Sequence, residues 1–195
     1  MRFLLYSLPW AIALVLLLTR CGGKFEPDPI DPRLPRYSEQ GLNAAGALIN
    51  DSRWRAVQAI SFLGSTSEDL RSDRDSSQVR LVIDGQRSDG APLVIVFHLN
   101  NADGDLDGIN GFRGRRFSLD GEHYATVQQN LVEIDSTSAC RSQTGQLFVK
   151  FLRFVDGRDN GRYVMAGTFS FTVEADSCTR YEVSSGRFDY RIEGY

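Results

Sequence analysis

The sequence has few of the side chains on which most enzymes and nucleic-acid-binding proteins depend. It contains only two histidines, His98 and His123, and no serine within a Gly-x-Ser-x-Gly motif. Its 22 basic side chains are outnumbered by 25 acidic ones, and no lysine- or arginine-rich stripe offers the basic face that nucleic acid requires. We therefore predict that the protein is not an enzyme, needs no organic cofactor and does not bind nucleic acid.

The N-terminus has the three parts of a secretory signal, which are a charged start, an apolar run and a small-residue exit. The apolar run over residues 3–18 has sixteen residues, fewer than the roughly 20 that cross a bilayer as a helix. Cys21 then precedes two glycines. This resembles the bacterial lipobox, where the signal is cleaved before a cysteine that carries a diacylglycerol, although Arg20 stands where a small residue is usual.

We therefore predict a signal peptide over residues 1–20, lipidation of Cys21, and a location at the outer membrane or cell surface, facing the periplasm or the exterior. Ordinary secretion and a transmembrane anchor are the alternatives. About 175 residues would remain after cleavage, which is the size of one domain. They carry 20 basic and 25 acidic side chains, a formal net charge of −5.

Proline is concentrated just after this signal. Four of the six prolines lie between Pro27 and Pro35, and only Pro92 follows them. Closely spaced prolines favour extended polyproline II and oppose both helix and sheet. Residues 21–36 are therefore predicted to be a semi-rigid spacer, with an N-terminal arm packed on the domain as the alternative. The folded domain is predicted to span residues 37–195.

Beyond residue 36, short alternating or apolar runs bounded by turn dipeptides predict strands rather than helices. About ten strands in one domain indicate an all-β fold, either an antiparallel sandwich or a lipocalin-like barrel. Residues 64–78 are polar and charged, and are predicted to be a surface loop with at most one helical turn. The predicted strands are Ala44–Asn50, Trp54–Leu63, Val79–Asp84, Leu93–Leu99, Arg116–Leu119, Tyr124–Gln128, Leu147–Val155, Tyr163–Val173, Tyr181–Ser184 and Arg187–Ile192.

Two cysteines remain after Cys21, namely Cys140 and Cys178. In an exported protein such a pair predicts a disulfide. Closing the loop of about 39 residues between them would stabilise the fold by roughly 4 kcal/mol in the chain-entropy model.

One loop has the spacing of a calcium site. Asp103, Asp105 and Asp107 alternate before Gly108, as at the first positions of a calcium-binding loop, and Ile109 would offer its backbone carbonyl. Position 12 is Gly114 rather than glutamate, so remote acids such as Asp120 or Glu122 would have to complete the shell. The alternative is an ordinary turn, because Asp, Asn and Gly are turn formers.

Short motifs near both ends of the domain resemble those of a Bacteroidota lipoprotein family of unknown function. They read G-x-N-x-x-G-x-x-x-N over residues 41–50 with Trp54 behind it, G-T-F-x-F over residues 167–171, and G-x-F-D over residues 186–189. The resemblance implies a lipid-anchored, mainly β domain with no established reaction or ligand. The glycines suit turns or close strand contacts, Trp54 suits a core, and Asp189 suits a bond to a neighbouring turn.

We therefore expect a non-enzymatic binding or structural module of the cell envelope, whose partners are the membrane, through the acyl anchor on Cys21, and an unidentified envelope protein or glycan. A secreted β-fold hydrolase acting on glycans and a barrel-type carrier of an apolar ligand are the alternatives. An exposed aromatic patch for a glycan would draw on six tyrosines, namely Tyr37, Tyr124, Tyr163, Tyr181, Tyr190 and Tyr195.

Overall fold

The computed structural model describes residues 27–57, 70–75, 78–100, 109–129, 140–156, 162–174 and 179–193. These residues form ten strands and one short 3-10 helix, η1 (Ile109–Phe112), and they contain no α-helix. The strands are β1 (Ala44–Ile49), β2 (Ser52–Ala56), β3 (Leu70–Asp75), β4 (Gln78–Arg87), β5 (Pro92–Asn100), β6 (Arg116–Ser118), β7 (Tyr124–Gln128), β8 (Ser142–Asp156), β9 (Arg162–Val173) and β10 (Tyr181–Glu193).

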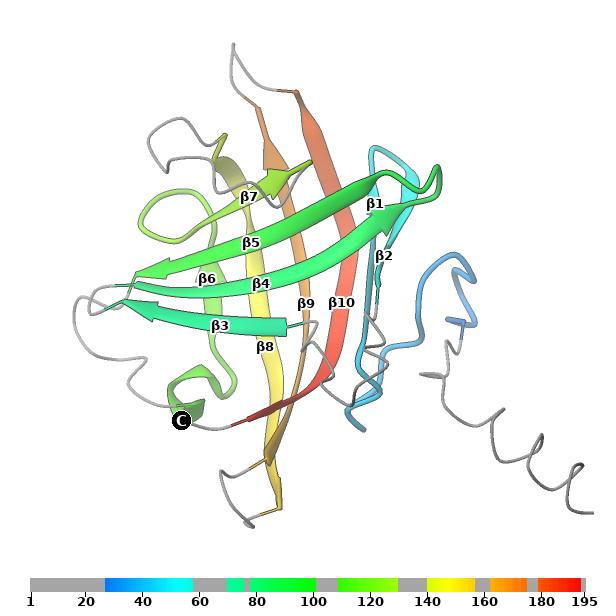
Figure 1. Cartoon of the computed structure of the whole chain (residues 1–195). Helices are drawn as coiled ribbons and strands as arrows, with labels where there is room; N and C mark the ends of the chain where they lie inside the picture. The colour runs from blue at the N-terminus through cyan, green and yellow to red at the C-terminus, as the bar shows by residue number, and fades with distance from the viewer. Residues whose placement is uncertain are drawn as a thin grey trace, which may run out of the picture.

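All ten strands belong to one antiparallel sheet that is nearly closed into a barrel. Their order is β6-β8-β9-β10-β1-β2-β4-β5-β7, and β3 pairs with β4 beside this path. Strands β3, β4 and β5 cross in front of β8, β9 and β10, so that the two halves of the sheet face each other (Figure 1). The prediction of an all-β fold is therefore confirmed, in its barrel form.

The barrel is drawn together where β7 meets the start of β8. Thr126 of β7 forms an isolated antiparallel bridge with Arg141. Next to this bridge, the hydroxyl of Ser142 accepts the backbone N–H of Ala125 at 2.8 Å and donates to the backbone carbonyl of Leu119 at 2.6 Å. Ser142 is buried. One buried hydroxyl thus connects the two ends of the sheet.

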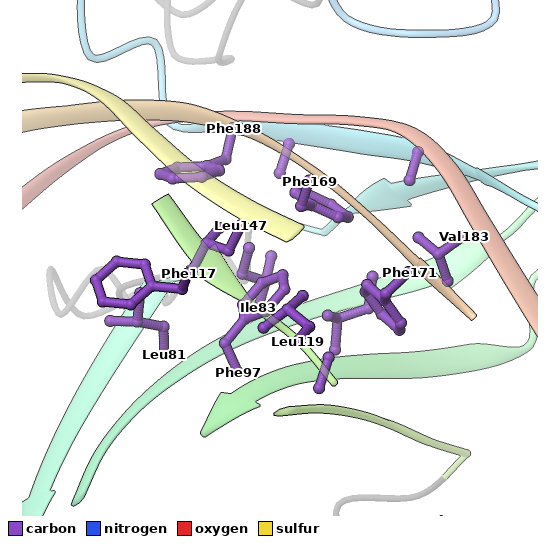
Figure 2. Packing of buried hydrophobic residues seen from close by; sticks show 14 of the residues in the cluster. Leu81, Ile83, Phe97, Phe117, Leu119, Leu147, Phe169, Phe171, Val183 and Phe188 are labelled. Atoms are coloured by element: carbon purple, nitrogen blue, oxygen red, sulfur yellow. The ribbon is translucent and has the colours of Figure 1, made fainter. Parts of the chain in front are cut away.

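The core lies between the two halves of the sheet (Figure 2). Phe97 of β5 packs edge-on against Phe169 and Phe171 of β9, with ring centroids 5.3 and 5.9 Å away. The predicted alternation that turns Phe169, Phe171 and Val173 to one face is confirmed, because all three are buried in the same cluster. Trp54 is also buried, and its indole N–H donates to the carbonyl of Leu93 at 2.8 Å.

Two strand predictions were wrong. The segment predicted to be a loop over residues 64–78 contains β3, which pairs with β4 along its whole length. The last two predicted strands are one strand, β10, whose pairing with β9 shifts between Val183 and Gly186. Ser185 there has a φ of 54°, so that a bulge bends the strand without ending it.

Residues 27–43, which we call the N-terminal strap, correct the prediction of an extended spacer. Pro27 and Pro35 pair across an antiparallel bridge, and the N–H of Asp28 donates to the carbonyl of Leu34 at 2.9 Å. Leu34 is fully buried, and the Asp28 carboxylate forms an ion pair with Arg187 of β10. The described part of the predicted spacer is therefore a compact turn packed on the barrel.

Candidate functional site

The predicted lipidation and calcium sites fall mostly on residues that the structure does not describe. Cys21 and the three aspartates Asp103, Asp105 and Asp107 lie outside the described residues, and Ile109 is the first residue of η1. Within the described ranges, no three His, Cys, Asp or Glu side chains are grouped closely enough to hold a metal ion. None of these ranges contains a helix with the length and apolarity to cross a membrane.

The start of the predicted calcium loop is nevertheless placed. Strand β5 ends at Asn100, whose backbone N–H donates to Nδ1 of His123 at 3.0 Å and whose side-chain amide lies 3.5 Å from the Glu122 carboxylate. Burial lowers the pKa of His123, and the charge of Glu122 partly opposes this shift. One of the two remote acids that we expected near this loop therefore lies where the loop leaves the sheet.

The predicted disulfide is only half described. Cys140 is half-buried and packs against the core, whereas Cys178 lies outside the described residues. Its neighbours in the sequence are placed, since Val173 pairs with Ser142 on one side and with Tyr181 on the other. The Cys140–Cys178 pairing stays a prediction.

Asp189, which ends the G-x-F-D motif, is the most fully bonded acidic side chain in the described structure. It is 3% exposed, and its two carboxylate oxygens accept the backbone N–H groups of Gly41 at 2.7 Å, Leu42 at 3.2 Å and Gln40 at 3.3 Å. The hydroxyl of Ser38 also donates to it. Gly41 has a φ of +68°, which turns the strap around the carboxylate. The expected bond from Asp189 to a neighbouring turn is confirmed.

His98 lies on the outer face of β5 in a stack of three side chains. Its ring is parallel to that of Tyr124, with centroids 4.4 Å apart, and the guanidinium of Arg141 lies 4.2 Å from the centre of the Tyr124 ring. Nε2 is 3.4 Å from the hydroxyl of Thr126 and Nδ1 is 3.5 Å from the amide oxygen of Gln78. The imidazole is thus held in place at both of its nitrogens.

The same surroundings keep His98 neutral. Burial, together with the positive charges of Arg80 and Arg141, lowers the pKa of His98 to about 4. A proton on this ring would be buried beside two cations, so the side chain has a structural role at neutral pH and is poorly suited to act as a general base.

The five tyrosines of the predicted patch that the structure describes do not form the exposed face that glycan stacking would need. Tyr124, Tyr181 and Tyr190 are buried. Tyr37 is half-buried in the strap, where the ammonium of Lys150 lies 5.0 Å from its ring centre. Tyr163 is on another strand, and Tyr195 lies outside the described residues. All five described tyrosines are therefore buried or half-buried.

The largest exposed aromatic side chain in the described structure belongs to a phenylalanine. Strands β8 and β9 run beyond β3, β4 and β5 at the lower end of the barrel (Figure 1). There Phe154 is 52% exposed and Val155 is 50% exposed. Phe154 is paired in register with Tyr163, and their rings meet edge to face at 5.2 Å. We call Lys150, Arg153, Phe154, Val155 and Tyr163 the hairpin end.

Sequence reasoning missed the hairpin end and the His98 stack for different reasons. Residues 147–155 were correctly predicted to be a strand, yet the sequence of one strand does not show how far it outruns its neighbours in the sheet. The His98 stack draws on three segments of the chain, and only the strand register brings them together. For the hairpin end, the only local signal is the spacing of phenylalanines 148, 151 and 154, which departs from the alternation expected of a strand.

In three comparisons with known proteins, no family model, no curated protein and no solved structure matches the chain. The likeness to the Bacteroidota lipoprotein family therefore stays a prediction that rests on the quoted motifs.

Proposed function

We propose that the protein is a lipid-anchored module of the bacterial cell envelope that acts by binding or as a structural element and not by catalysis. The packed interior of the barrel carries this proposal. Phe97 on one wall touches Phe169 and Phe171 on the other, so these rings fill the barrel at their level (Figure 2). A carrier of an apolar ligand would need that space.

The buried polar side chains support the same proposal against the alternative of a glycan hydrolase. A hydrolase of that kind needs two carboxylates facing one substrate-sized space. The buried carboxylate of Asp189 is instead surrounded by N–H groups of the strap. His98 is neutral and held between neighbours. Both side chains stabilise the fold in the arrangement that is described.

Labelling with palmitate tests the anchor. The parent chain should take up label, and the Cys21→Ala variant should not, whereas Cys140→Ala serves as a matched cysteine control that keeps the label. Equal labelling of the parent and Cys21→Ala would refute lipidation at this residue.

Two further measurements test the mode of action. Incubation of the purified protein with bacterial envelopes should release no soluble sugar, and its release by the parent but not by a heat-inactivated sample would favour a hydrolase. Native mass spectrometry should show the mass of the chain with its acyl modification alone. An additional apolar molecule that is lost on denaturation would favour a carrier.

A disulfide between Cys140 and Cys178 belongs to this proposal. Cys140 precedes Ser142 by two residues, and Cys178 lies between Val173 and Tyr181, which pair with each other. Because Val173 also pairs with Ser142, both cysteines belong to segments that meet at one end of the sheet. Alkylation of the unreduced, denatured protein should leave both thiols unmodified, and two modified thiols would contradict the bridge.

A further inference from the structure

We propose that the hairpin end is a second membrane contact, in which Phe154 and Val155 enter an anionic lipid surface while nearby cations meet its phosphate groups. This inference deepens the lipid-anchored function proposed above, because it states which part of the barrel faces the membrane. It rests on the exposure, pairing and charge of described residues at the end of β8, β9 and β10.

The strand register gives this end of the sheet two unlike faces. One cross-strand row consists of Arg153, Val164 and Arg191, and the next consists of Phe154, Tyr163 and Ile192. Successive rows of an antiparallel sheet point to opposite faces. The outer face therefore carries two exposed cations beside the buried Val164, and the inner face carries the exposed Phe154 beside Tyr163 and Ile192, which pack against the core. Such an amphipathic element suits the boundary between lipid headgroups and acyl chains.

The exposed side chain of Phe154 is held firmly. Just inside the hairpin end, Leu152 and Met165 are paired in register and buried, and the ring of Tyr163 supports that of Phe154. The side chain of Phe154 is thus presented to solvent by a paired backbone and not by a loose loop. A fixed apolar side chain loses little conformational entropy when it enters lipid.

The size of the apolar surface favours lipid over a protein partner. An aromatic side chain buries about 150–250 Å², so that half of Phe154 together with half of Val155 offers on the order of 200 Å². A stable protein interface buries about 800 Å² on each partner. Two side chains near the end of β8 are too few for that, but they are sufficient for insertion at a membrane surface.

Charge selects the kind of lipid. The mature chain carries a net charge of −5, so an anionic membrane would repel most of its surface. The exposed cations of this region have the opposite sign, namely Lys150 and Arg153 of the hairpin end and Arg191 in the same cross-strand row as Arg153. Each cation near an anionic surface strengthens binding about fivefold. The barrel should therefore approach such a surface with this end first.

Tryptophan placed at the hairpin end tests the contact in the mature acylated chain reconstituted in vesicles. With vesicles of phosphatidylglycerol and phosphatidylcholine that carry brominated acyl chains, Phe154→Trp should show emission quenched about twofold beyond that of the parent chain, whose Trp54 sets the baseline. Val155→Trp is a second reporter in case the first variant folds poorly. Val57→Trp is the matched control, because Val57 is also exposed but follows β2, which lies four strands from β8 in the sheet order.

Charge provides a second readout. Adding Arg153→Glu to Phe154→Trp should lower the apparent affinity for vesicles, measured by quenching, about tenfold. Raising salt from about 0.1 M to 1 M should have a similar effect, because it shortens the screening length from roughly 10 Å to 3 Å. Vesicles of phosphatidylcholine alone should give little quenching.

Equal quenching of the Phe154→Trp and Val57→Trp reporters would overturn the proposal. A change in Phe154→Trp emission that appears without vesicles when the protein concentration is raised would also overturn it. Such a result would assign the surface to contact with a second copy of the chain. If the parent chain takes up no palmitate but the Phe154→Trp reporter is quenched, the proposed anchor fails and the hairpin contact stands. If the parent chain is labelled but the reporter is not quenched, the anchor stands and the hairpin contact fails.

Discussion

The carboxylate of Asp189 should be among the most costly polar side chains to remove, and its replacement tests whether the strap is an integral part of the fold. In Asp189→Ala, the N–H groups of Gln40, Gly41 and Leu42 lose their shared acceptor, as does the hydroxyl of Ser38. In the variant these donors would surround the space that the carboxylate fills in the parent. Solvent reaches this space poorly, since Asp189 is only 3% exposed.

The magnitude follows from burial. A buried donor left without an acceptor costs about 1–3 kcal/mol. The bond from Gly41 is buried, and those from Gln40 and Leu42 are partly buried, so water can reach the latter two more readily. We therefore expect Asp189→Ala to lower the free energy of unfolding by about 3–4 kcal/mol. A domain of this size has roughly 5–15 kcal/mol in total.

Urea unfolding followed by the fluorescence of buried Trp54 measures the change. Ser38→Ala is the matched control, because it removes one hydroxyl donor and should cost about 1 kcal/mol. Asp189→Asn should cost nearly as much as Asp189→Ala, since its amide nitrogen would face donors. A loss below about 1 kcal/mol for Asp189→Ala would refute the reasoning and show that the strap contributes little to folding.

Three other outcomes follow from the described contacts. The pKa of His98 in the folded protein, about 4, lies below the ordinary histidine value of 6.5. Its contribution to stability is therefore complete above about pH 6.5 and is lost as pH falls toward 4, by at most about 3 kcal/mol. His98→Gln should lack this part of the pH dependence of unfolding, and parallel curves for parent and variant would disprove it. Ser142→Ala leaves the N–H of Ala125 without its acceptor and should cost about 1–3 kcal/mol with faster exchange of that amide, whereas unchanged exchange would mean that the seam is held elsewhere. Millimolar calcium should raise the melting temperature of the parent but not of a chain carrying Asp103→Asn and Asp105→Asn, and identical melting with calcium and with chelator would remove the predicted site.

The strands that sequence predicted best are those whose hydrophobic pattern matches their burial. In β9 the alternation of phenylalanine with hydroxyl side chains indicates directly which residues meet the core, because the period of a strand matches the period of the pattern. In β5 a continuous apolar run marks a strand whose two faces are both covered, and the side chains from Leu93 to Leu99 are indeed buried. Hydrophobic pattern and burial carry the same information in these strands.

Strand β3 shows where this information ends. Its sequence, residues 70–75, contains four charged side chains among six, which is typical of a loop. It is a strand because β4 extends past β2 and leaves an edge whose backbone groups can pair. Backbone hydrogen bonds at an edge do not require apolar side chains. Only the length of the neighbouring strand, which lies in another part of the sequence, predicts β3.

The sequence indicated that Asp189 bonds a turn, but it did not predict the folded strap that supplies the donors, for a related reason. Local composition favours polyproline II over residues 27–35, but the buried Leu34 and the ion pair between Asp28 and Arg187 outweigh that preference. Asp28 also accepts the backbone N–H groups of Ile30 and Asp31, which lower its pKa. Contacts between residues some 150 positions apart decide the conformation, and one sequence does not display them.

Because the strap is folded, the distance between the proposed anchor and the barrel becomes short. Only residues 22–26 separate Cys21 from Pro27, and six residue steps reach at most about 20 Å. An acylated chain would thus keep the hairpin end at a high effective concentration near the same membrane. That concentration falls roughly as the −3/2 power of linker length, so inserting about 20 glycine and serine residues after Gly23 should lower it about tenfold.

The consequence is measurable at the salt concentration at which brominated lipid quenches the Phe154→Trp reporter to half of its maximal extent. There the insertion should reduce quenching by brominated lipid and leave urea unfolding unchanged, because the strap and barrel are untouched. Adding Arg153→Glu should remove the effect of the insertion, since the contact is then already broken. Quenching that does not depend on linker length would show that the short tether does not assist the hairpin, and that the two membrane contacts act independently.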